Sequence, residues 1–169
     1  LQHVVAGLTP PLARGFGVTR AYEAVDDSSG VRRDADGTWR IRLGARVRVR
    51  IAIGNAGPRY HVAIVDPLPA AFEAINPALA GEGQAVPPAP RWASADRIPL
   101  FAEHVNVRSD RFEAFRTRLD PGRYDLVYIA IATTPGDFAA PAPRAEDMYS
   151  PETFGRGAAE RVIVEARAR

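Results

Sequence analysis

The 169-residue sequence has 20 acidic residues, three histidines and no cysteine, and none of these side chains stands at a recognisable catalytic or metal-ligand spacing. The absence of cysteine excludes a thiol nucleophile, a disulfide and a cysteine-ligated metal site within the chain. His61 and His104 could share a metal, but no acidic residue stands at a spacing typical of zinc ligands. We therefore expect no metal and no cofactor. A metalloenzyme that uses these two histidines is kept as an alternative, which metal analysis would test.

The carboxylates are also poorly placed for catalysis. Most aspartates fall in short Gly-, Ser- or Pro-containing segments, where their side chains favour turns. Glu146 and Asp147 are adjacent, and successive side chains of an extended segment point apart, so the two do not converge as a catalytic pair. The sequence contains no Gly-x-Ser-x-Gly elbow, phosphate-binding loop or dinucleotide fingerprint. We predict that the chain is not an enzyme.

The most informative stretch is 144–156, RAEDMYSPETFGR, which holds the only methionine, Met148, beside Tyr149. A long loop without its own periodicity is usually functional or disordered, and a disordered loop has little reason to hold an apolar pair. We therefore interpret 141–155 as a contact loop with Met148 and Tyr149 at its centre. In the alternative, both side chains fill a gap in the core of their own domain. The residues that we expect to support the pair are Glu146, Asp147 and Pro151.

The elements that must position this loop are predicted to be strands. In 46–53 the sequence RVRVRIAI alternates arginine and apolar residues, which indicates a strand with one buried face and one solvated face. Asp36-Gly37 predicts a hairpin turn, and 81–90 is rich in Gly and Pro, which predicts a surface loop. Short strands separated by such turns predict an all-β fold, an antiparallel β-sandwich. The expected strands are 16–23, 39–43, 46–53, 59–65, 72–75, 101–108, 112–119, 123–133 and 161–165.

Composition limits the other possibilities. Hydrophobic residues make up 46% and charged residues 25% of the chain, which is typical of a globular protein. We expect one β-sandwich domain at 14–169, preceded by a linker or tail at 1–13. All 22 basic residues are arginine and they alternate along strands, so we expect no nucleic-acid partner. No apolar run approaches the roughly 18 residues that span a bilayer, so we expect no direct membrane insertion. Because the sole methionine is internal, we expect the chain to be an excised piece of a longer protein.

Three blocks carry a family resemblance: 59–77 (RYHVAIVDPLPAAFEAINP), 101–115 (FAEHVNVR and then FEAF), and 132–152 (ATTPGDF leading to AEDMYSPE). In this order they resemble the C-terminal macroglobulin-type domain of bacterial α2-macroglobulins, which are large thioester protease traps. The resemblance covers about residues 14–166 and is most specific in DPLP…FE and AEDMYSPE. It implies a sandwich of immunoglobulin-like architecture.

The resemblance also implies a mechanism. In such proteins a neighbouring domain carries a cysteine–glutamine thioester, proteases cleave a bait region, and the exposed thioester bonds to the attacking protease. This chain has no cysteine, so it would be the domain that packs on the thioester domain of the same polypeptide. Met148 and Tyr149 match the pair thought to shield the thioester from water, for which a flat ring and a flexible thioether are suitable.

The resemblance further implies a periplasmic location, a parent protein that is often lipid-anchored, and a possible association with a penicillin-binding protein. One alternative from another functional class, a recognition module rather than part of a protease trap, remains. The chain could be a stand-alone β-sandwich module for recognition or adhesion, with 81–90 and 141–155 as its contact surface. In that case the isolated chain should bind an external ligand tightly.

Overall fold

The computed structural model describes residues 9–75, 98–99 and 102–166. This part of the chain consists of strands and one short 3-10 helix, η1 (Ser28–Gly30). The strands are β1 (Leu12–Arg14), β2 (Gly17–Ala24), β3 (Val31–Arg33), β4 (Trp39–Arg42), β5 (Arg46–Asn55), β6 (Arg59–Pro67), β7 (Phe72–Ala74), β8 (Ile98–Pro99), β9 (His104–Val107), β10 (Arg111–Leu119), β11 (Gly122–Ala132), β12 (Gly136–Ala140), β13 (Arg144–Asp147), β14 (Ser150–Arg156) and β15 (Glu160–Glu165).

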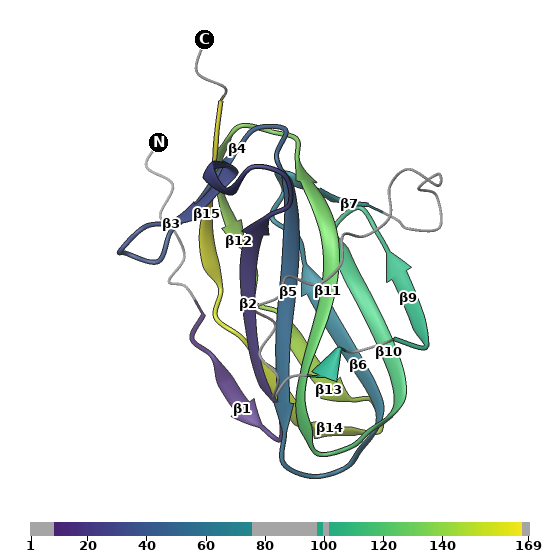
Figure 1. The fold of residues 1–169 in the computed structure, drawn as a ribbon. Helices are drawn as coiled ribbons and strands as arrows, with labels where there is room; N and C mark the ends of the chain where they lie inside the picture. Colours follow the sequence, from purple (N-terminus) through teal and green to yellow (C-terminus); the bar gives the residue numbers. More distant parts are fainter. Residues whose placement is uncertain (1–8, 76–97, 100–101, 167–169) are drawn as a thin grey trace.

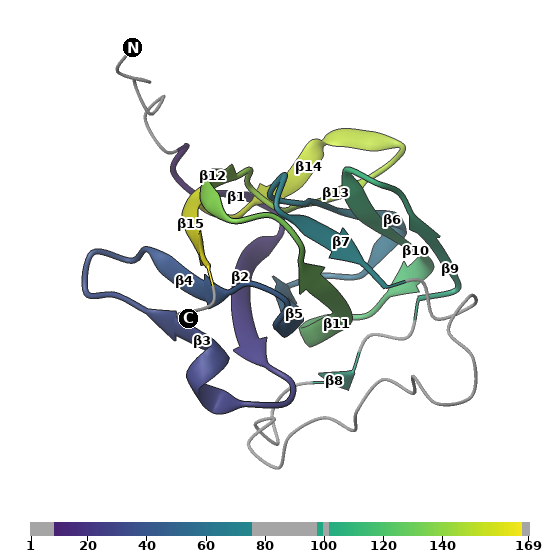
Figure 2. The same ribbon diagram turned by 90° about the horizontal axis from the view of Figure 1, so that it is seen from above.

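The strands form three sheets. Sheet A has the order β1-β14-β13-β6-β10-β9, sheet B has the order β2-β5-β11-β7 with β8 also on β11, and sheet C has the order β12-β15-β4-β3. Sheets A and B face each other as two layers, and sheet C closes one side (Figures 1 and 2). Neighbouring strands are antiparallel except β4 with β15 and β8 with β11, which are parallel. The predicted all-β fold is thereby confirmed, with a third sheet that the sequence did not indicate.

The core lies between the sheets, and β5 shows why. Val47, Val49 and Ile51 have no exposed surface, as the alternation predicted. The opposite face of β5 is less solvated than expected, because Arg48 is only 7% exposed. β5 lies between β2 and β11, and its outer arginines form ion pairs with Glu23 of β2 and with Asp125 of β11. The prediction that Arg48 is solvated was therefore wrong.

The stretch predicted as a long contact loop is a β-hairpin instead. β13 and β14 pair with each other, and β13 also pairs with β6. The hairpin lacks a hydrophobic alternation because its inward residues are small. Ala145 is completely buried opposite Gly155, and a Cβ atom on Gly155 would lie 2.2 Å from the backbone oxygen of Phe16. The close passage of the chain at Phe16 therefore requires glycine at this position.

One predicted boundary changes, and two other predictions lie outside the described residues. β1 pairs with β14 through Leu12–Arg14, so the predicted boundary after residue 13 falls inside a strand and the sheet begins at Leu12. The expected surface loop at 81–90 and the start of the expected strand at 101 lie outside the described residues. Within the described part of the chain, no helix is long and apolar enough to cross a membrane.

Candidate contact site at the tip of the β13–β14 hairpin

Met148 and Tyr149 form the two-residue turn between β13 and β14. They are 50% and 77% exposed, respectively, so they do not fill the core of their own domain, and that alternative was wrong. The carboxylate of Asp147 accepts a hydrogen bond from the backbone N–H of Tyr149 (3.2 Å), the kind of local bond by which aspartate stabilises turns. Two large apolar side chains are thus held outside the domain at the tip of a hairpin, the contact tip.

His61 of β6 anchors the contact tip from the neighbouring strand. Its backbone oxygen accepts a hydrogen bond from the backbone N–H of Met148 (3.0 Å). Its ring meets the ring of Tyr149 edge-to-face, with the centroids 4.8 Å apart and an interplanar angle of 88°. Such pairs contribute roughly 0.5–1.5 kcal/mol beyond the area that they bury. The sequence had indicated His61 only as a candidate metal ligand.

The other residues predicted to support the pair lie on the hairpin in different roles. Glu146 forms an ion pair with Arg144 (2.6 Å). The guanidinium of Arg144 also lies over the ring of Phe154, 4.8 Å from its centroid. The pairing of β13 with β14 passes from Glu146–Phe154 directly to Asp147–Ser150, so Pro151 lies in an exposed bulge of β14. Proline suits this position because it has no N–H to donate to a ladder.

The base of the hairpin is fixed where the three sheets meet. Arg20 of β2 is almost fully buried and forms an ion pair with Asp66 of β6 (2.7 Å) and a longer one with Glu160 of β15 (3.4 Å). The same guanidinium donates to the backbone oxygens of Ala140 (3.2 Å) and Pro141 (2.9 Å), just before β13. This junction links β6, which carries His61, to the segment that leads into the contact tip.

Tyr128 of β11 completes the junction by donating its hydroxyl to Asp66 (2.6 Å). Burial raises the pKa of Tyr128 well above its ordinary value, so the hydroxyl keeps its proton and remains a donor. Burial also raises the pKa of Asp66, whereas Arg20 and the Tyr128 hydroxyl favour its charged form. Because these groups are interior and fully engaged with one another, we assign the junction a structural role.

The two histidines considered as metal ligands are not brought together. His61 faces Tyr149, whereas the ring Nε2 of His104 lies 2.9 Å from the side-chain oxygen of Asn106 on β9. Strand β10 separates β6 from β9, so the two histidines lie on strands roughly 10 Å apart. Among the described residues no group of three histidine or acidic side chains could hold a metal ion. The structure therefore offers no support for the metalloenzyme.

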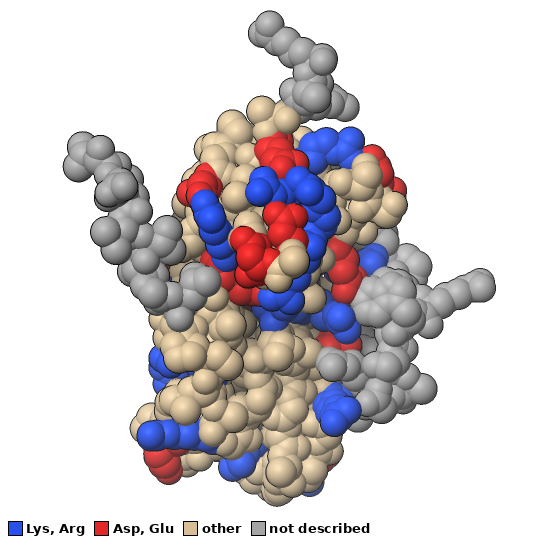
Figure 3. Space-filling model, turned by 90° about the vertical axis from the view of Figure 1, so that its left-hand side faces the viewer, with Lys and Arg blue, Asp and Glu red and all other residues tan. Residues whose placement is uncertain are grey.

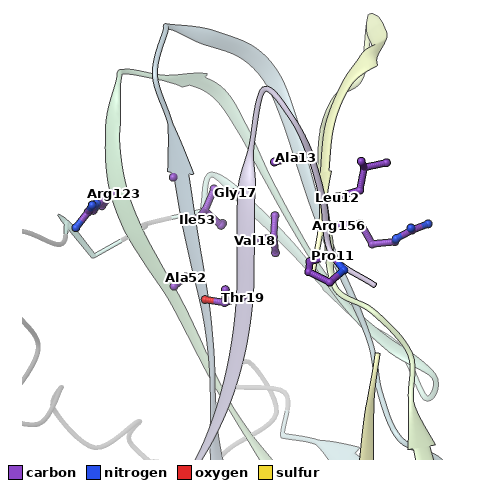
Figure 4. Close-up of a pocket in the computed structure, with 11 residues that line it drawn as sticks. Pro11, Leu12, Ala13, Gly17, Val18, Thr19, Ala52, Ile53, Arg123 and Arg156 are labelled. Carbon is purple, nitrogen blue, oxygen red and sulfur yellow. The ribbon is translucent and has the colours of Figure 1, made fainter. Parts of the chain in front are cut away.

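A cleft of about 440 Å³ lies away from the contact tip, where β1 approaches β2 and β5 (Figure 4). Its described lining is mostly apolar, with Val18 and Ile53 among the lining residues and two arginines, Arg123 and Arg156. No histidine or carboxylate lines the described part of the cleft, so its lining provides no acid–base pair.

On the face shown in Figure 3, arginines alternate with acidic residues instead of forming an uninterrupted basic patch.

These features define a class: an all-β sandwich domain whose described residues include an exposed apolar pair at a hairpin tip and no group of three histidine or acidic side chains placed to hold a metal ion. The chain belongs to the family "Bacterial Alpha-2-macroglobulin MG10 domain", whose sequence model matches residues 15–152.

Relatives and solved structures agree with this assignment. The chain is 32% identical over 167 residues to an α2-macroglobulin homolog of Nostoc and 31% identical over 134 residues to the α2-macroglobulin of Escherichia coli. These matches cover 96% and 73% of the chain but only 8% of each relative.

The fold is similar to part of E. coli α2-macroglobulin activated by porcine elastase (28% identity, TM-score 0.70, 93% of this chain and 14% of that one). It is also similar to part of native E. coli α2-macroglobulin spanning domain MG7 to the C-terminus (26% identity, TM-score 0.71, 92% and 24%).

Proposed function

We propose that this chain is the C-terminal domain of a bacterial α2-macroglobulin-like protease trap, and that its contact tip covers the thioester in the neighbouring domain of the same polypeptide. The observation that carries the proposal is the exposure of Met148 and Tyr149 on a fixed hairpin tip. Among the described residues, 28 hydrophobic residues are buried, whereas Tyr149 is the most exposed of the large hydrophobic side chains and Met148 beside it is half exposed. Full burial of an exposed side chain of this size contributes roughly 1.5–3 kcal/mol, so a partner surface that covers the mostly exposed Tyr149 and the half-exposed Met148 would gain part of that from each.

The chemistry of the contact tip suits a lid. A thioester in water hydrolyses or reacts with amines, so a resting trap must exclude water and nucleophiles from it. The Tyr149 ring supplies a large rigid apolar surface, and the Met148 thioether adapts to an irregular gap beside it. Cleavage of the bait region would withdraw the contact tip and expose the thioester to the attacking protease.

The remaining features of the proposal follow from the family. We propose that the domain has no catalytic activity and no cofactor of its own, and that the parent protein engages target proteases. One solved relative is an α2-macroglobulin activated by porcine elastase, which supports proteases as partners of the parent protein. We further propose a periplasmic location, with a lipid-anchored parent and a penicillin-binding protein as a possible partner.

Free-thiol titration of the whole parent polypeptide tests the lid. The wild type should keep its thiol masked for hours and release it on addition of methylamine. Tyr149→Ala should release the thiol without methylamine, whereas Tyr149→Phe, which keeps the ring, should behave as the wild type. Leu12→Ala is a matched control, because it shortens another exposed apolar side chain, on β1, which pairs with the end of β14 remote from the contact tip.

If Tyr149→Ala keeps its thiol masked like the wild type, the lid proposal is wrong. An exposed contact tip would then favour the second candidate, a β-sandwich recognition or adhesion module. That candidate predicts tight binding of an external ligand by the 169-residue chain alone and a parent polypeptide that lacks a thioester. Metal analysis of the purified chain tests the metalloenzyme alternative separately.

A further inference from the structure

His61 has an unusual backbone conformation beside the contact tip. Among the described residues it is the only one other than glycine with a positive φ, at 49°. An L-residue with a side chain adopts this left-handed conformation at a cost of roughly 1–2 kcal/mol. The residue is the third of strand β6 (Arg59–Pro67) rather than part of a turn, so the surrounding structure must maintain the strain.

This conformation takes His61 out of the strand pairing between β6 and β10. On the other side of β6, the carbonyl and ring of His61 face the β13–β14 hairpin. Between β6 and β10 the pairing runs Tyr60–Arg118 and Val62–Arg116 and omits His61. Thr117, which stands opposite, instead donates its backbone N–H and its hydroxyl to the carboxylate of Glu103 (3.0 and 2.6 Å). The carbonyl of His61 accepts from Met148, and its ring contacts Tyr149.

We propose that His61 is a positioning residue that holds the Tyr149 ring in the orientation in which it meets its partner. This inference rests on the proposed function, because it names what presents the lid. The left-handed backbone places the imidazole against Tyr149, and the edge-to-face contact limits the rotamers of a ring that is 77% exposed. Without this contact, the ring would have to be ordered at the moment of docking.

Glycine and phenylalanine at this position separate the ring contact from the backbone. His61→Gly accepts a positive φ at no steric cost, and this relief of strain offsets the loss of the ring contact and the entropic cost of glycine, so the variant should unfold at about the same denaturant concentration. His61→Phe keeps an aromatic ring in the same strained backbone. A residue that served only fold stability would show loss of stability and loss of masking together. A positioning residue predicts that His61→Gly loses masking while its stability stays about the same.

The first measurement is the NMR spectrum of the Tyr149 ring in the 169-residue chain. In the wild type the ring protons should be shifted from random-coil positions by the neighbouring imidazole. In His61→Gly they should move to random-coil positions, and in His61→Phe they should stay shifted. In the whole polypeptide, His61→Gly should raise the spontaneous rate of thiol release about 2-fold to 12-fold, the factor that corresponds to one aromatic pair.

Failure of this inference and failure of the lid proposal can be told apart. An unchanged Tyr149 ring spectrum in His61→Gly overturns the positioning role. The same conclusion follows if Tyr149→Ala releases the thiol while His61→Gly keeps it masked, and the lid proposal then stands. A thiol that stays masked in Tyr149→Ala overturns the lid proposal itself.

Discussion

The hydroxyl of Tyr128 should contribute more to stability than any other tyrosine hydroxyl in the core. Tyr128→Phe removes the donor that lies 2.6 Å from Asp66. It leaves the ring in place, stacked on Phe112 at a centroid distance of 4.2 Å and an angle of 3°. The only change is therefore the loss of one of the hydrogen bonds to a carboxylate that is 1% exposed.

The size of the effect follows from the charge and burial of the acceptor. A hydrogen bond to a charged group contributes roughly 1.5–3 kcal/mol, and among the described residues Asp66 keeps Arg20 as its side-chain donor in the variant. We expect the free energy of unfolding to fall by about 2 kcal/mol. For a chain of this length the thermal midpoint should then fall by roughly 4–8 °C.

Two other tyrosines provide matched controls. Tyr124 donates to the neutral backbone oxygen of Asp120 (2.9 Å), so Tyr124→Phe should cost about 1 kcal/mol. The hydroxyl of Tyr22 is buried without a hydrogen-bond partner among the described residues, so Tyr22→Phe should be neutral or slightly stabilising. Urea denaturation of the three variants gives the order directly. A loss in Tyr128→Phe no larger than that in Tyr22→Phe would refute the role assigned to the junction.

Two further predictions concern the hairpin and the surface. Gly155→Ala should destabilise the chain by about 3 kcal/mol in urea denaturation, since its Cβ would meet backbone atoms of Phe16. Gly57→Ala, where the added Cβ meets nothing within 4 Å, should cost far less, and equal losses would contradict the close passage. Hydrogen bonds from Arg42, and then from the backbone and side chain of Ser29, lower the pKa of Asp27 from 3.8 to about 2. The ionised Asp27 carboxylate therefore stabilises the fold above pH 3.8, and this contribution is lost as the pH falls toward 2. Arg42→Ala should raise this pKa toward 3.8 in a carboxyl NMR titration, and an unchanged pKa would show that the ion pair does not form in solution.

The sequence predicted the strands whose two faces differ in polarity. β5 is an example, because Val47, Val49 and Ile51 alternate with arginines and are completely buried. The same logic failed for the hairpin β13–β14, whose inward residues Ala145 and Gly155 are too small to produce a hydrophobic signal. The requirement for small residues arises from a close passage of two distant segments, which no local pattern encodes.

The contact tip was predicted only in part. The composition of 144–156 and the family resemblance indicated Met148 and Tyr149, and the structure places both on the surface. Neither the supporting role of His61 nor its positive φ could be predicted, because histidine in an apolar strand carries no signal for a left-handed backbone. The junction at Arg20 was also missed, since its partners lie 46 and 140 residues away in the sequence.

The central claim is that the contact tip is covered in the resting parent protein and uncovered on activation. Met148 tests this directly, because it is the only methionine of the chain and its thioether is oxidised by peroxide where it is accessible. Peptide mass mapping should show rapid oxidation of Met148 in the 169-residue chain, protection in the whole resting polypeptide, and renewed oxidation after a protease cleaves the bait region. Equal oxidation rates in the isolated chain and in the resting polypeptide would contradict the account.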